Sequence, residues 1–389
     1  MAIVGYVIET VHYAYRLRPG AQAEHALISE WNRCRFLWNE AVHQQKSGRK
    51  PTFVKLSKLL TEARGQHSWL REGSSVAQQQ MLRVYGQALN DSFKVKGRGR
   101  PKFKVRRRSL PSLEYTLRGF SIADGRLILP KGTSIPVVWS RDLPCEPTSV
   151  RIYRDSLGDW YASFVVRRDV EPAPVVDGAI GIDWGVTTTA TTTDPAHDLH
   201  YLGHRRRCAE DLAKAQRTMA RRQRPRGQAP SNGYRYARQQ AAKLQKKAAR
   251  QTQHDSRVWA KNVVDNHQLI AVEDLKPKFL AKSTMARKAA DAAIGAAKRE
   301  LIERGKRAGR TVVMVQPAYT TMTCSGCFAR AKQRLELAER TFRCDTCGHT
   351  EGRDRNAARV ILAVAERGHT SVDGFRHLRP PSEDVAGAA

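Results

Sequence analysis

Four cysteines towards the carboxyl-terminal end of the chain have the spacing of a metal site. Cys324 and Cys327 form one C-x2-C pair, and Cys344 and Cys347 form a second pair after sixteen intervening residues. Each pair can form a tight turn that presents two thiolates, and two such turns complete one tetrahedral Zn²⁺ site. Gly348 follows the second pair and gives the backbone freedom that such a turn needs. Free thiols or a redox pair are the alternatives, but a redox motif would not be duplicated at this spacing, so the sequence predicts one structural zinc.

Three acidic residues lie at the ends of regular elements, where carboxylates can bind divalent cations. Asp183 ends the apolar run 179–182, Glu273 ends the apolar run 269–272, and Asp354 opens a helical run with a buried stripe. Singly, each has an ordinary alternative: a turn residue, a solvent-facing strand end and a helix N-cap. Three carboxylates that meet over a sheet need cations to offset their repulsion, and two Mg²⁺ ions about 4 Å apart can assist phosphodiester hydrolysis. Asp183, Glu273 and Asp354 are therefore predicted to be catalytic and to hold magnesium.

The chain has a large excess of positive charge. It contains 68 Lys and Arg against 37 Asp and Glu, a formal net charge of +31, and a polyanion such as nucleic acid is the expected partner. Residues 94–108 hold nine basic residues and no acid and are expected to form a flexible loop, while residues 204–261 hold seventeen basic residues against three acids. Tyr234, Tyr236 and Trp259 lie among these and can either stack on bases or pack between helices. The predicted nucleic-acid contacts are Lys94, Lys96, Arg98, Arg100, Lys102, Lys104, Arg205, Arg206, Arg207, Arg221 and Arg222.

Composition narrows the class of protein. The 389 residues suffice for two or three domains without disulfides, and 41% hydrophobic with 27% charged residues is typical of a soluble globular chain. The sequence shows no signal peptide and no run approaching the ~18 apolar residues of a membrane helix. We therefore expect a cytoplasmic protein that associates with the nucleoid when bound to DNA.

Hydrophobic periodicity predicts an α/β multidomain protein. A first strand is followed by a helical region, and short β-rich runs then indicate a small barrel or sandwich. A three-stranded meander, two basic helices and further alternating strands and helices complete the chain. The expected ranges are strand 1–18, helices 21–93, β-rich region 109–168, meander 179–202, helices 205–223 and 234–264, strand 268–272, helix 284–308, strand 311–315 and helix 354–367.

Several motifs, in order, resemble the RuvC and zinc segments of TnpB, the transposon-encoded family of RNA-guided nucleases related to type V CRISPR effectors. The resemblance spans almost the whole chain and is strongest from residue 178 to 362. Phe328, where a glycine often follows the first cysteine pair, and Trp184, in place of a commoner aliphatic residue, depart from the family pattern. The motifs are Gly181-Ile-Asp183-Trp-Gly185, Ala271-Val-Glu273-Asp-Leu275, the two cysteine pairs, Arg353-Asp354-Arg-Asn356-Ala-Ala358, Tyr15-Arg-Leu-Arg-Pro19 and Cys34-Arg-Phe-Leu-Trp-Asn39.

The resemblance implies a ribonuclease H-like RuvC nuclease domain with an inserted zinc ribbon, plus an amino-terminal wedge β-barrel that carries a helical recognition insert. It also implies a guide RNA, recognition of a short motif beside the target, and cleavage of double-stranded DNA at one RuvC centre. The implied domains are the wedge at 1–18 and 104–172, recognition helices at 19–103, RuvC at 173–317 and 351–368, a target-binding zinc ribbon at 318–350 and a disordered tail at 369–389.

Three alternatives stay open. A family member that binds DNA and represses without cutting would share most of these motifs, although the intact acidic triad favours a nuclease. An unguided RuvC-type nuclease would explain the carboxylates but not the zinc ribbon or the basic amino-terminal half. A structural zinc-containing RNA-binding module would leave the carboxylates unexplained.

Overall fold

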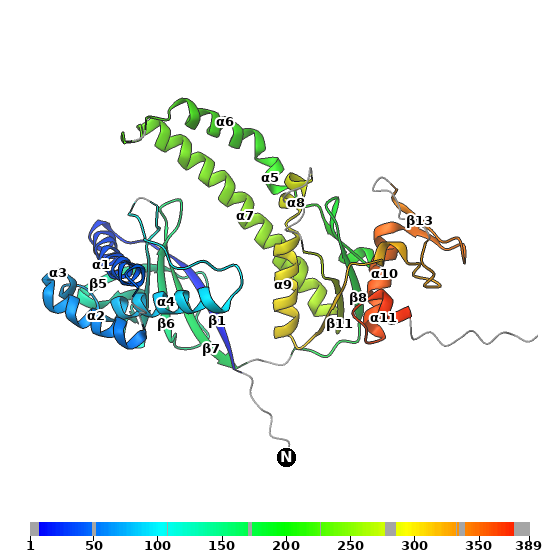
Figure 1. The fold of residues 1–389 in the computed structure, drawn as a ribbon, viewed down its shortest axis with the longest axis horizontal. Helices are drawn as coiled ribbons and strands as arrows, with labels where there is room; N and C mark the ends of the chain where they lie inside the picture. The colour runs from blue at the N-terminus through cyan, green and yellow to red at the C-terminus, as the bar shows by residue number, and fades with distance from the viewer. Residues whose placement is uncertain are drawn as a thin grey trace, which may run out of the picture. The chain divides into compact units, whose positions relative to one another are not determined.

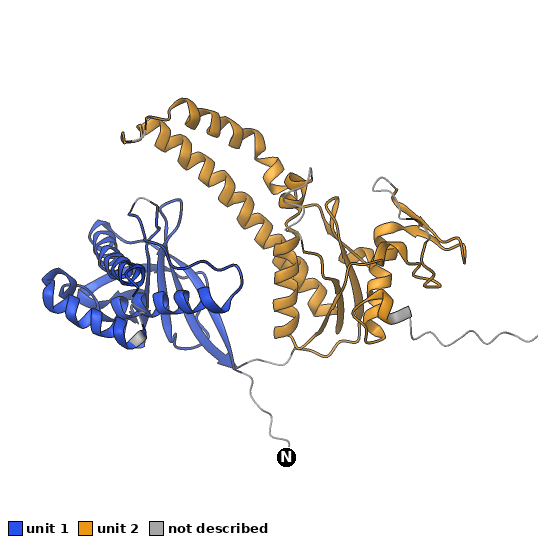
Figure 2. Ribbon diagram, viewed as in Figure 1, with its two compact units in different colours: residues 1–171 blue, residues 172–389 orange. Residues whose placement is uncertain are grey.

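The chain divides into two compact units, Met1–Glu171 and Pro172–Ala389, in a computed structural model (Figure 2). The structure describes residues 8–48, 52–106, 108–169, 173–225, 227–276, 285–331, 333 and 339–376. Among these residues, no helix has the length and apolar character needed to cross a membrane.

Unit 1 is built on one antiparallel sheet. Its centre is the pairing of β1 with β7, which runs from Ile8 opposite Asp169 to Leu17 opposite Trp160. The sheet order is β2-β6-β7-β1-β5-β4-β3, so β2 and β3 are its edges and hydrogen bonding among the described strands does not close the barrel that we expected. Instead, α4 packs against the edge strand β2. The strands are β1 (Ile8–Leu17), β2 (Ser112–Thr116), β3 (Ser121–Ala123), β4 (Arg126–Leu129), β5 (Thr133–Val138), β6 (Ser149–Arg154) and β7 (Trp160–Asp169).

Four helices share the core of this sheet: α1 (Ala21–Lys46) and α4 (Ser75–Lys94) pack against its strands, α2 (Phe53–Gln66) packs on α4, and α3 (Ser68–Arg71) packs on α2. The side chains of Thr52 and Ser74 accept hydrogen bonds from the first turns of α2 and α4, as N-caps do. Apolar residues of α1, such as Trp31 and Leu37, are buried in one cluster with Tyr15 of the sheet. The helical insert and the strands therefore form one compact unit.

The basic segment that follows α4 is anchored rather than free. We call residues 94–106 the basic strap. The indole of Trp38 donates to the carbonyl of Lys102 (2.9 Å), and the Asn39 side chain accepts from the backbone N–H of Lys104 (2.8 Å) and donates to its carbonyl (3.2 Å). α1 thus holds the strap backbone at Lys102 and Lys104, and flexibility of the preceding residues stays a prediction; Arg107 lies outside the described residues.

Unit 2 contains a mixed five-stranded sheet in the order β10-β9-β8-β11-β12, of which β8 and β11 are labelled in Figure 1. The expected meander is present, since β8 pairs antiparallel with β9 and β9 with β10. β8, β11 and β12 are parallel to one another. Parallel strands end at the same edge of a sheet, so residues that end β8 and β11 are brought together. The strands are β8 (Ala179–Trp184), β9 (Thr188–Thr192), β10 (Leu199–His200), β11 (Leu269–Glu273) and β12 (Thr311–Val315).

Helices cover both faces of this sheet. Ile180 and Ile182 face a core that contains residues of α7 (Asn232–Asn266) and α9 (Ile294–Arg307). Ala271 faces the opposite core, which contains residues of α10 (Arg353–Glu366). Gly181 is the point of closest approach, because a Cβ placed there would lie 2.1 Å from the carbonyl oxygen of Ala358. A glycine at this position lets α10 pack directly on β8.

Two sequence expectations about the helices of unit 2 are wrong. The expected helix 284–308 is two helices, α8 (Ala286–Ala292) and α9, because Ala293 has a left-handed backbone (φ 56°). The tail expected to be disordered from residue 369 continues the fold as far as residue 376. The Thr370 carbonyl accepts from Gln316 N (2.8 Å), and Val372, at the start of α11 (Val372–Arg376), is buried. Residues 377–389 lie outside the described residues.

The two basic helices also differ in detail from expectation. The first is divided at Cys208 into α5 (His204–Arg207) and α6 (Ala209–Arg221). α6 and α7 pack together as a helical hairpin (Figure 1). The carboxyl-terminal part of unit 2 adds the small hairpin β13 (Thr341–Arg343) and β14 (Thr350–Gly352) next to α10.

Candidate active site and metal centre

The two cysteine pairs form turns with the same backbone hydrogen bonds. In the first turn, Cys324 N donates to Ala329 O (2.9 Å) and Phe328 N donates to Cys324 O (3.0 Å). In the second, Cys344 N donates to His349 O and Gly348 N to Cys344 O, both at 2.9 Å. Phe328 and Gly348 occupy equivalent positions, and both have positive φ angles (59° and 73°). Phe328 therefore adopts, at some conformational cost, the left-handed backbone that glycine adopts freely.

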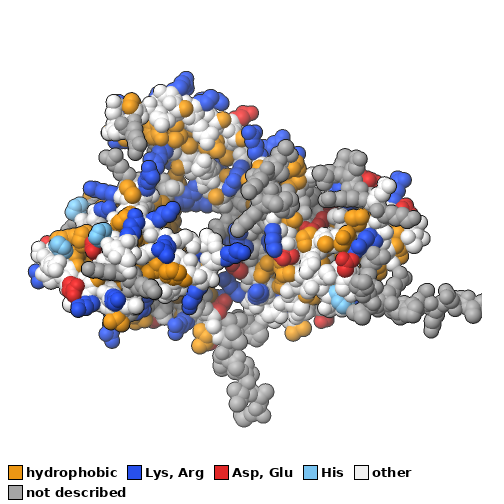
Figure 3. Space-filling model, viewed as in Figure 1, with side chains coloured by type: hydrophobic (Ala, Val, Ile, Leu, Met, Phe, Trp, Pro, Cys, Tyr) orange, Lys and Arg blue, Asp and Glu red, His pale blue; other side chains and the backbone are white. Residues whose placement is uncertain are grey.

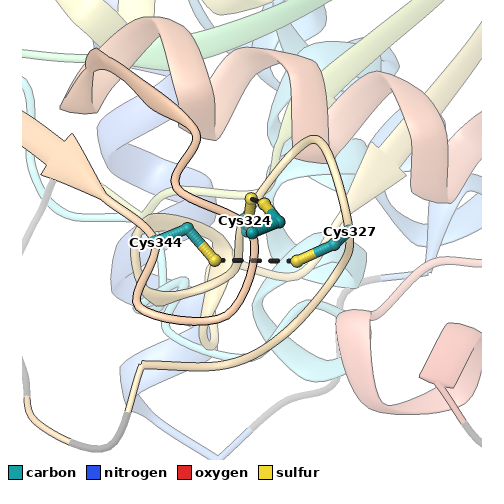
Figure 4. A group of neighbouring side chains, drawn as sticks. Cys324, Cys327 and Cys344 are labelled. Carbon is teal, nitrogen blue, oxygen red and sulfur yellow. Dashed lines mark hydrogen bonds between the residues drawn. The ribbon is translucent and has the colours of Figure 1, made fainter.

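The four sulfurs fit a tetrahedral metal site. The ligand atoms of Cys324, Cys327, Cys344 and Cys347 all lie within 4.8 Å of one another. The sulfurs of Cys327 and Cys344 face each other (Figure 4) and lie 3.6 Å apart, and Cys324 Sγ lies 3.7 Å from Cys347 Sγ. Zn–S bonds of about 2.3 Å arranged tetrahedrally place sulfurs about 3.8 Å apart. Both of these sulfur–sulfur distances match that separation.

The pKa values of two of the thiols indicate that the site needs a cation. Burial opposes ionisation of Cys344, but N–H groups of Cys347 and Thr346 lower its pKa to about 7. Burial, together with the neighbouring sulfurs, raises the pKa of Cys327 to about 12. Four thiolates this close require a cation, as the donor set of a structural zinc site does.

The carboxylates come from three separate elements of unit 2. Asp183 lies near the end of β8, Glu273 ends β11, and Asp354 is in the first turn of α10. The residues before the first two, Ile182 and Val272, are direct neighbours in the parallel register. Side chains alternate along a strand, so Asp183 points to the same face as Gly181, where α10 packs. Register and helix packing thus direct all three acids to one place.

Electrostatics shows that the three acids are close enough to interact. Asp183 and Glu273 are 7% and 6% exposed. Burial raises the pKa of Asp183 well above its usual range, and the charges of Glu273 and Asp354 raise it further. Burial raises the pKa of Glu273 to about 7. Among the described residues, only the four thiols form a tight group of three or more potential ligands, so the carboxylates are spaced more loosely.

Cations surround these acids. The guanidinium groups of Arg353 and Arg340 lie 3.2 and 3.6 Å from the carboxylate oxygens of Asp354. Lys298 of α9 contacts Asp274 (2.8 Å) and opposes the pKa rise of Glu273. Nothing in the spacing of the sequence pointed to Lys298, because its place depends on how α9 packs against β11.

Asn356 joins the cysteine site to the acidic site, and sequence reasoning gave it no role. Its side chain is fully buried, accepts from Ser325 N (2.9 Å) and donates to Thr323 O (2.7 Å). These two residues flank Cys324, whereas Asn356 lies two residues after Asp354 on α10. The first cysteine turn and the helix that carries Asp354 are therefore held together by one amide. Its position in the Arg353–Ala358 motif was the available signal.

Arg355 makes a second connection from the start of α10. Its guanidinium donates to both carboxylate oxygens of Asp198, at 2.9 and 3.2 Å. Asp198 also accepts from the backbone N–H of Thr192 (2.8 Å) at the end of β9. Such a bidentate pair fixes the helix start against the sheet.

The basic residues predicted to contact nucleic acid are exposed, with the exception of Lys104. The Lys104 amine lies 4.2 Å from the ring centroid of Trp38, and burial lowers its pKa, so this residue supports the basic strap from within. Lys and Arg side chains are common on the face of the molecule in Figure 3, and Asp and Glu are sparse. Trp259 is buried against Trp184, which supports helix packing for it, whereas Tyr236 is exposed.

The fold and the site define an α/β protein with a four-cysteine metal knuckle held against three interacting carboxylates. Two family models match this chain: "Probable transposase" at residues 163–284 and "Cas12f1-like, TNB domain" at residues 295–361. A protein of Streptomyces pristinaespiralis named "Putative RNA-guided DNA endonuclease" is 30% identical over 381 residues, 95% of this chain and 93% of that protein. The chain belongs to the TnpB family.

Further similarities include one more curated protein and one solved structure. "Putative RNA-guided DNA endonuclease InsQ" of Escherichia coli (strain K12) is 27% identical over 379 residues, 90% of this chain and 91% of that protein. The solved structure "Cryo-EM structure of the Cas12f1-sgRNA-target DNA complex" matches with 15% identity and a TM-score of 0.49 over 92% of this chain and 99% of that chain.

Proposed function

We propose that this chain is an RNA-guided DNA endonuclease that hydrolyses phosphodiester bonds at a single centre formed by Asp183, Glu273 and Asp354. The observation that carries the proposal is the convergence of three acids from distant elements at one sheet edge, with raised pKa values for two of them. Perturbed carboxylates held together in this way are a signature of a functional site. The full-length similarity to proteins named RNA-guided DNA endonucleases supplies the reaction and the partners.

The sheet of unit 2 supports a ribonuclease H-like RuvC assignment. An antiparallel β8–β9–β10 meander is followed by the parallel strands β11 and β12, with helices on both faces. We assign RuvC to residues 173–317 and 351–368 and the target-binding zinc ribbon to 318–350. In unit 1 we assign the wedge domain to 1–18 and 104–172 and the recognition helices to 19–103, which share one core with it.

The chain's own residues explain how such a centre works. Asp183 and Glu273 are fixed by sheet register, and Arg355 and Asn356 fix the helix that carries Asp354. Burial raises the pKa values of the first two acids, so a divalent cation competes with protons for them. Asp183, Glu273 and Asp354 would hold two Mg²⁺ ions, which would supply activation of a water and charge stabilisation of the leaving oxygen.

We further propose that Cys324, Cys327, Cys344 and Cys347 bind one structural Zn²⁺. The sulfur separations of 3.6 and 3.7 Å support this metal, since they match a tetrahedral thiolate site. The two hydrogen bonds of Asn356 then hold α10 in a fixed position relative to the first cysteine turn. The zinc ion would stabilise the fold of the two cysteine turns and would take no part in the reaction at the DNA.

The experiment that tests the proposal begins with the RNA that co-purifies with the chain. Sequencing that RNA identifies the guide, and a duplex matched to it is then incubated with the complex and Mg²⁺. We expect cleavage of the matched duplex and none of a mismatched one. Binding of the matched duplex without cutting would favour a repressor, and cutting without any RNA would favour an unguided nuclease.

A further inference from the structure

A cavity of about 750 Å³ lies at the edge of the sheet where β8 ends, on the face that packs against α7 and α9, whereas the Asp183 side chain at this edge points to the face covered by α10. The turn from β8 to β9 begins two residues after Asp183 and contributes Val186 and Thr187 to its wall. β9 starts and β10 ends at this edge because both pairings are antiparallel, and Tyr201, which follows β10, is also in the wall. We call this cavity the edge pocket. The remaining lining residues come from α5, α6 and α8: Arg205, Arg206, Ala209, Arg287, Lys288, Ala290 and Asp291.

The edge pocket is built on a buried acid. Asp291 is 4% exposed and accepts hydrogen bonds from the hydroxyl of Tyr201 (2.9 Å) and from the backbone N–H groups of Arg205 (2.8 Å) and Arg206 (3.0 Å). The Thr189 hydroxyl donates to Ala292 O (3.3 Å) and ties the sheet to the end of α8. These contacts fix the position of α5 relative to α8, so the wall between them is preformed.

Four cations of the edge pocket lack a carboxylate partner. Within the part of the chain that the structure describes, no Asp or Glu forms an ion pair with the side chains of Arg205, Arg206, Arg287 or Lys288. Asp291 is already occupied by the Tyr201 hydroxyl and two backbone N–H groups. Cations gathered at one opening repel each other unless an anion binds between them.

The lining has two chemical characters. Val186, Ala209, Ala290 and the ring of Tyr201 give apolar surface, and the guanidinium and ammonium groups give positive charge. A nucleotide has the same two parts, a flat base that can lie against apolar or aromatic surface and a phosphate that pairs with cations. Arg and Lys are also the usual phosphate ligands of proteins.

We propose that the edge pocket binds a nucleotide of the DNA strand that is being cut, with its base against Tyr201 and its phosphates against the four cations. This inference rests on the proposed function and places one part of the substrate strand at the sheet edge that carries Asp183 and Glu273, on the face opposite α10. Holding one nucleotide in a fixed place restricts how the rest of the strand approaches the carboxylates.

Photocrosslinking tests this directly. Guide-loaded Asp183→Ala protein is given matched duplexes in which 5-iodouracil replaces one thymine near the cut, in the target strand or in the other strand, and a third sample carries the label in the guide. We expect Tyr201 to crosslink to labelled DNA and not to the labelled guide. Adding Ala290→Trp, which fills the cavity, should reduce that crosslink at least tenfold. Crosslinking of Tyr201 only to the guide, or to no strand, would overturn the proposal.

Charge removal gives a second test. We expect the double variant Arg205→Ala/Arg287→Ala to cut at least tenfold more slowly, with guide binding and thermal stability unchanged. The slope of log DNA affinity against log salt concentration should weaken by roughly 0.7 for each phosphate that the variant no longer neutralises. Lys306→Ala is the matched control. This exposed lysine lies at the carboxyl-terminal end of α9, away from α8, so its replacement should leave cutting unchanged. Equal rates for the double variant and its control would refute the pocket while leaving the proposed function intact.

If the unaltered protein does not cut a matched duplex, the proposed function fails independently of the pocket. The same iodouracil label in a single-stranded DNA then decides the matter for the edge pocket. A crosslink at Tyr201 that Ala290→Trp suppresses would support a nucleotide site, and its absence would overturn it.

Discussion

The two ligand clusters of unit 2 are assembled in opposite ways. The four cysteines lie within residues 324–347, and two matching turns bring their sulfurs within 4.8 Å. The three acids span residues 183 to 354 and meet only because β8 and β11 are parallel neighbours and α10 packs on β8. The first cluster is closed and tight, and the second is looser and more dependent on the rest of the fold.

This difference separates what local spacing determines from what packing determines. A structural metal site needs only two turns at a suitable distance in the sequence. A cleavage centre must leave room for substrate, so its ligands come from rigid elements that converge without filling the space. The side-chain amide of Asn356 connects the two sites, because it binds the residues on both sides of Cys324 and lies on the helix that carries Asp354.

The largest effect is expected from Cys344→Ser. Zinc should fall from one ion per chain to none, and the knuckle should lose its structure, since structural zinc supplies folding free energy of roughly 10 kcal/mol or more. Elemental analysis and thermal unfolding measure this. Cys208→Ser, which changes a cysteine outside the cluster, should retain its zinc. Full zinc content in Cys344→Ser would show that the knuckle does not depend on all four thiolates.

Gly181→Ala tests whether the acidic cluster depends on helix packing. The added Cβ would lie 2.1 Å from the Ala358 carbonyl, so α10 must shift and carry Asp354 with it. We expect stability to fall by roughly 1 to 3 kcal/mol, and cutting to fall with zinc content unchanged. Gly65→Ala in α2, where a Cβ meets nothing within 4 Å, is the control. An active, fully stable Gly181→Ala protein would argue against close packing of α10.

Asn356→Leu should uncouple the two clusters. Thr323 O and Ser325 N lose their partner, with an expected loss of roughly 1 to 3 kcal/mol in unfolding free energy. Zinc should stay bound, while cutting falls roughly 10- to 100-fold, as for other residues that orient metal ligands. Asn266→Leu, at an exposed asparagine whose side chain donates to Asn262, provides the comparison. If zinc is lost together with activity, Asn356 stabilises the knuckle and does not connect it to Asp354.

The smallest effect concerns pH. The folded protein holds the Glu273 proton more tightly than the unfolded chain, because burial raises its pKa from 4.5 to about 7. The unfolding free energy of the metal-free protein should therefore fall, on the order of 2 kcal/mol, as the pH rises from 4.5 to about 7. Mg²⁺ affinity should rise over the same pH range. Thermal unfolding between pH 5 and 8, with and without Mg²⁺, measures both. In Glu273→Gln this dependence should become weaker, with the remainder assigned to Asp183, whose pKa is also raised by burial, and an unchanged dependence would contradict a contribution from Glu273.

The sequence predicted these parts unequally. The grouping of the four cysteines followed from their spacing, and strands β8, β11 and β12 followed from short apolar runs. The break falls at Ala293 itself and not at Gly295 two residues later, and the burial of Val372 depends on a core that no local pattern describes. The basic strap was expected to be flexible, because its anchors Trp38 and Asn39 lie more than sixty residues away.

The most direct measurement compares binding and cutting in one variant. Guide-loaded Asp183→Ala protein is given a matched duplex with Mg²⁺ beside the unaltered complex. We expect cutting to fall by several orders of magnitude, since a metal ligand is lost, while binding persists through base pairing and positive charge. Undiminished cutting would show that Asp183 is only a turn residue, and joint loss of binding and folding would make its role structural.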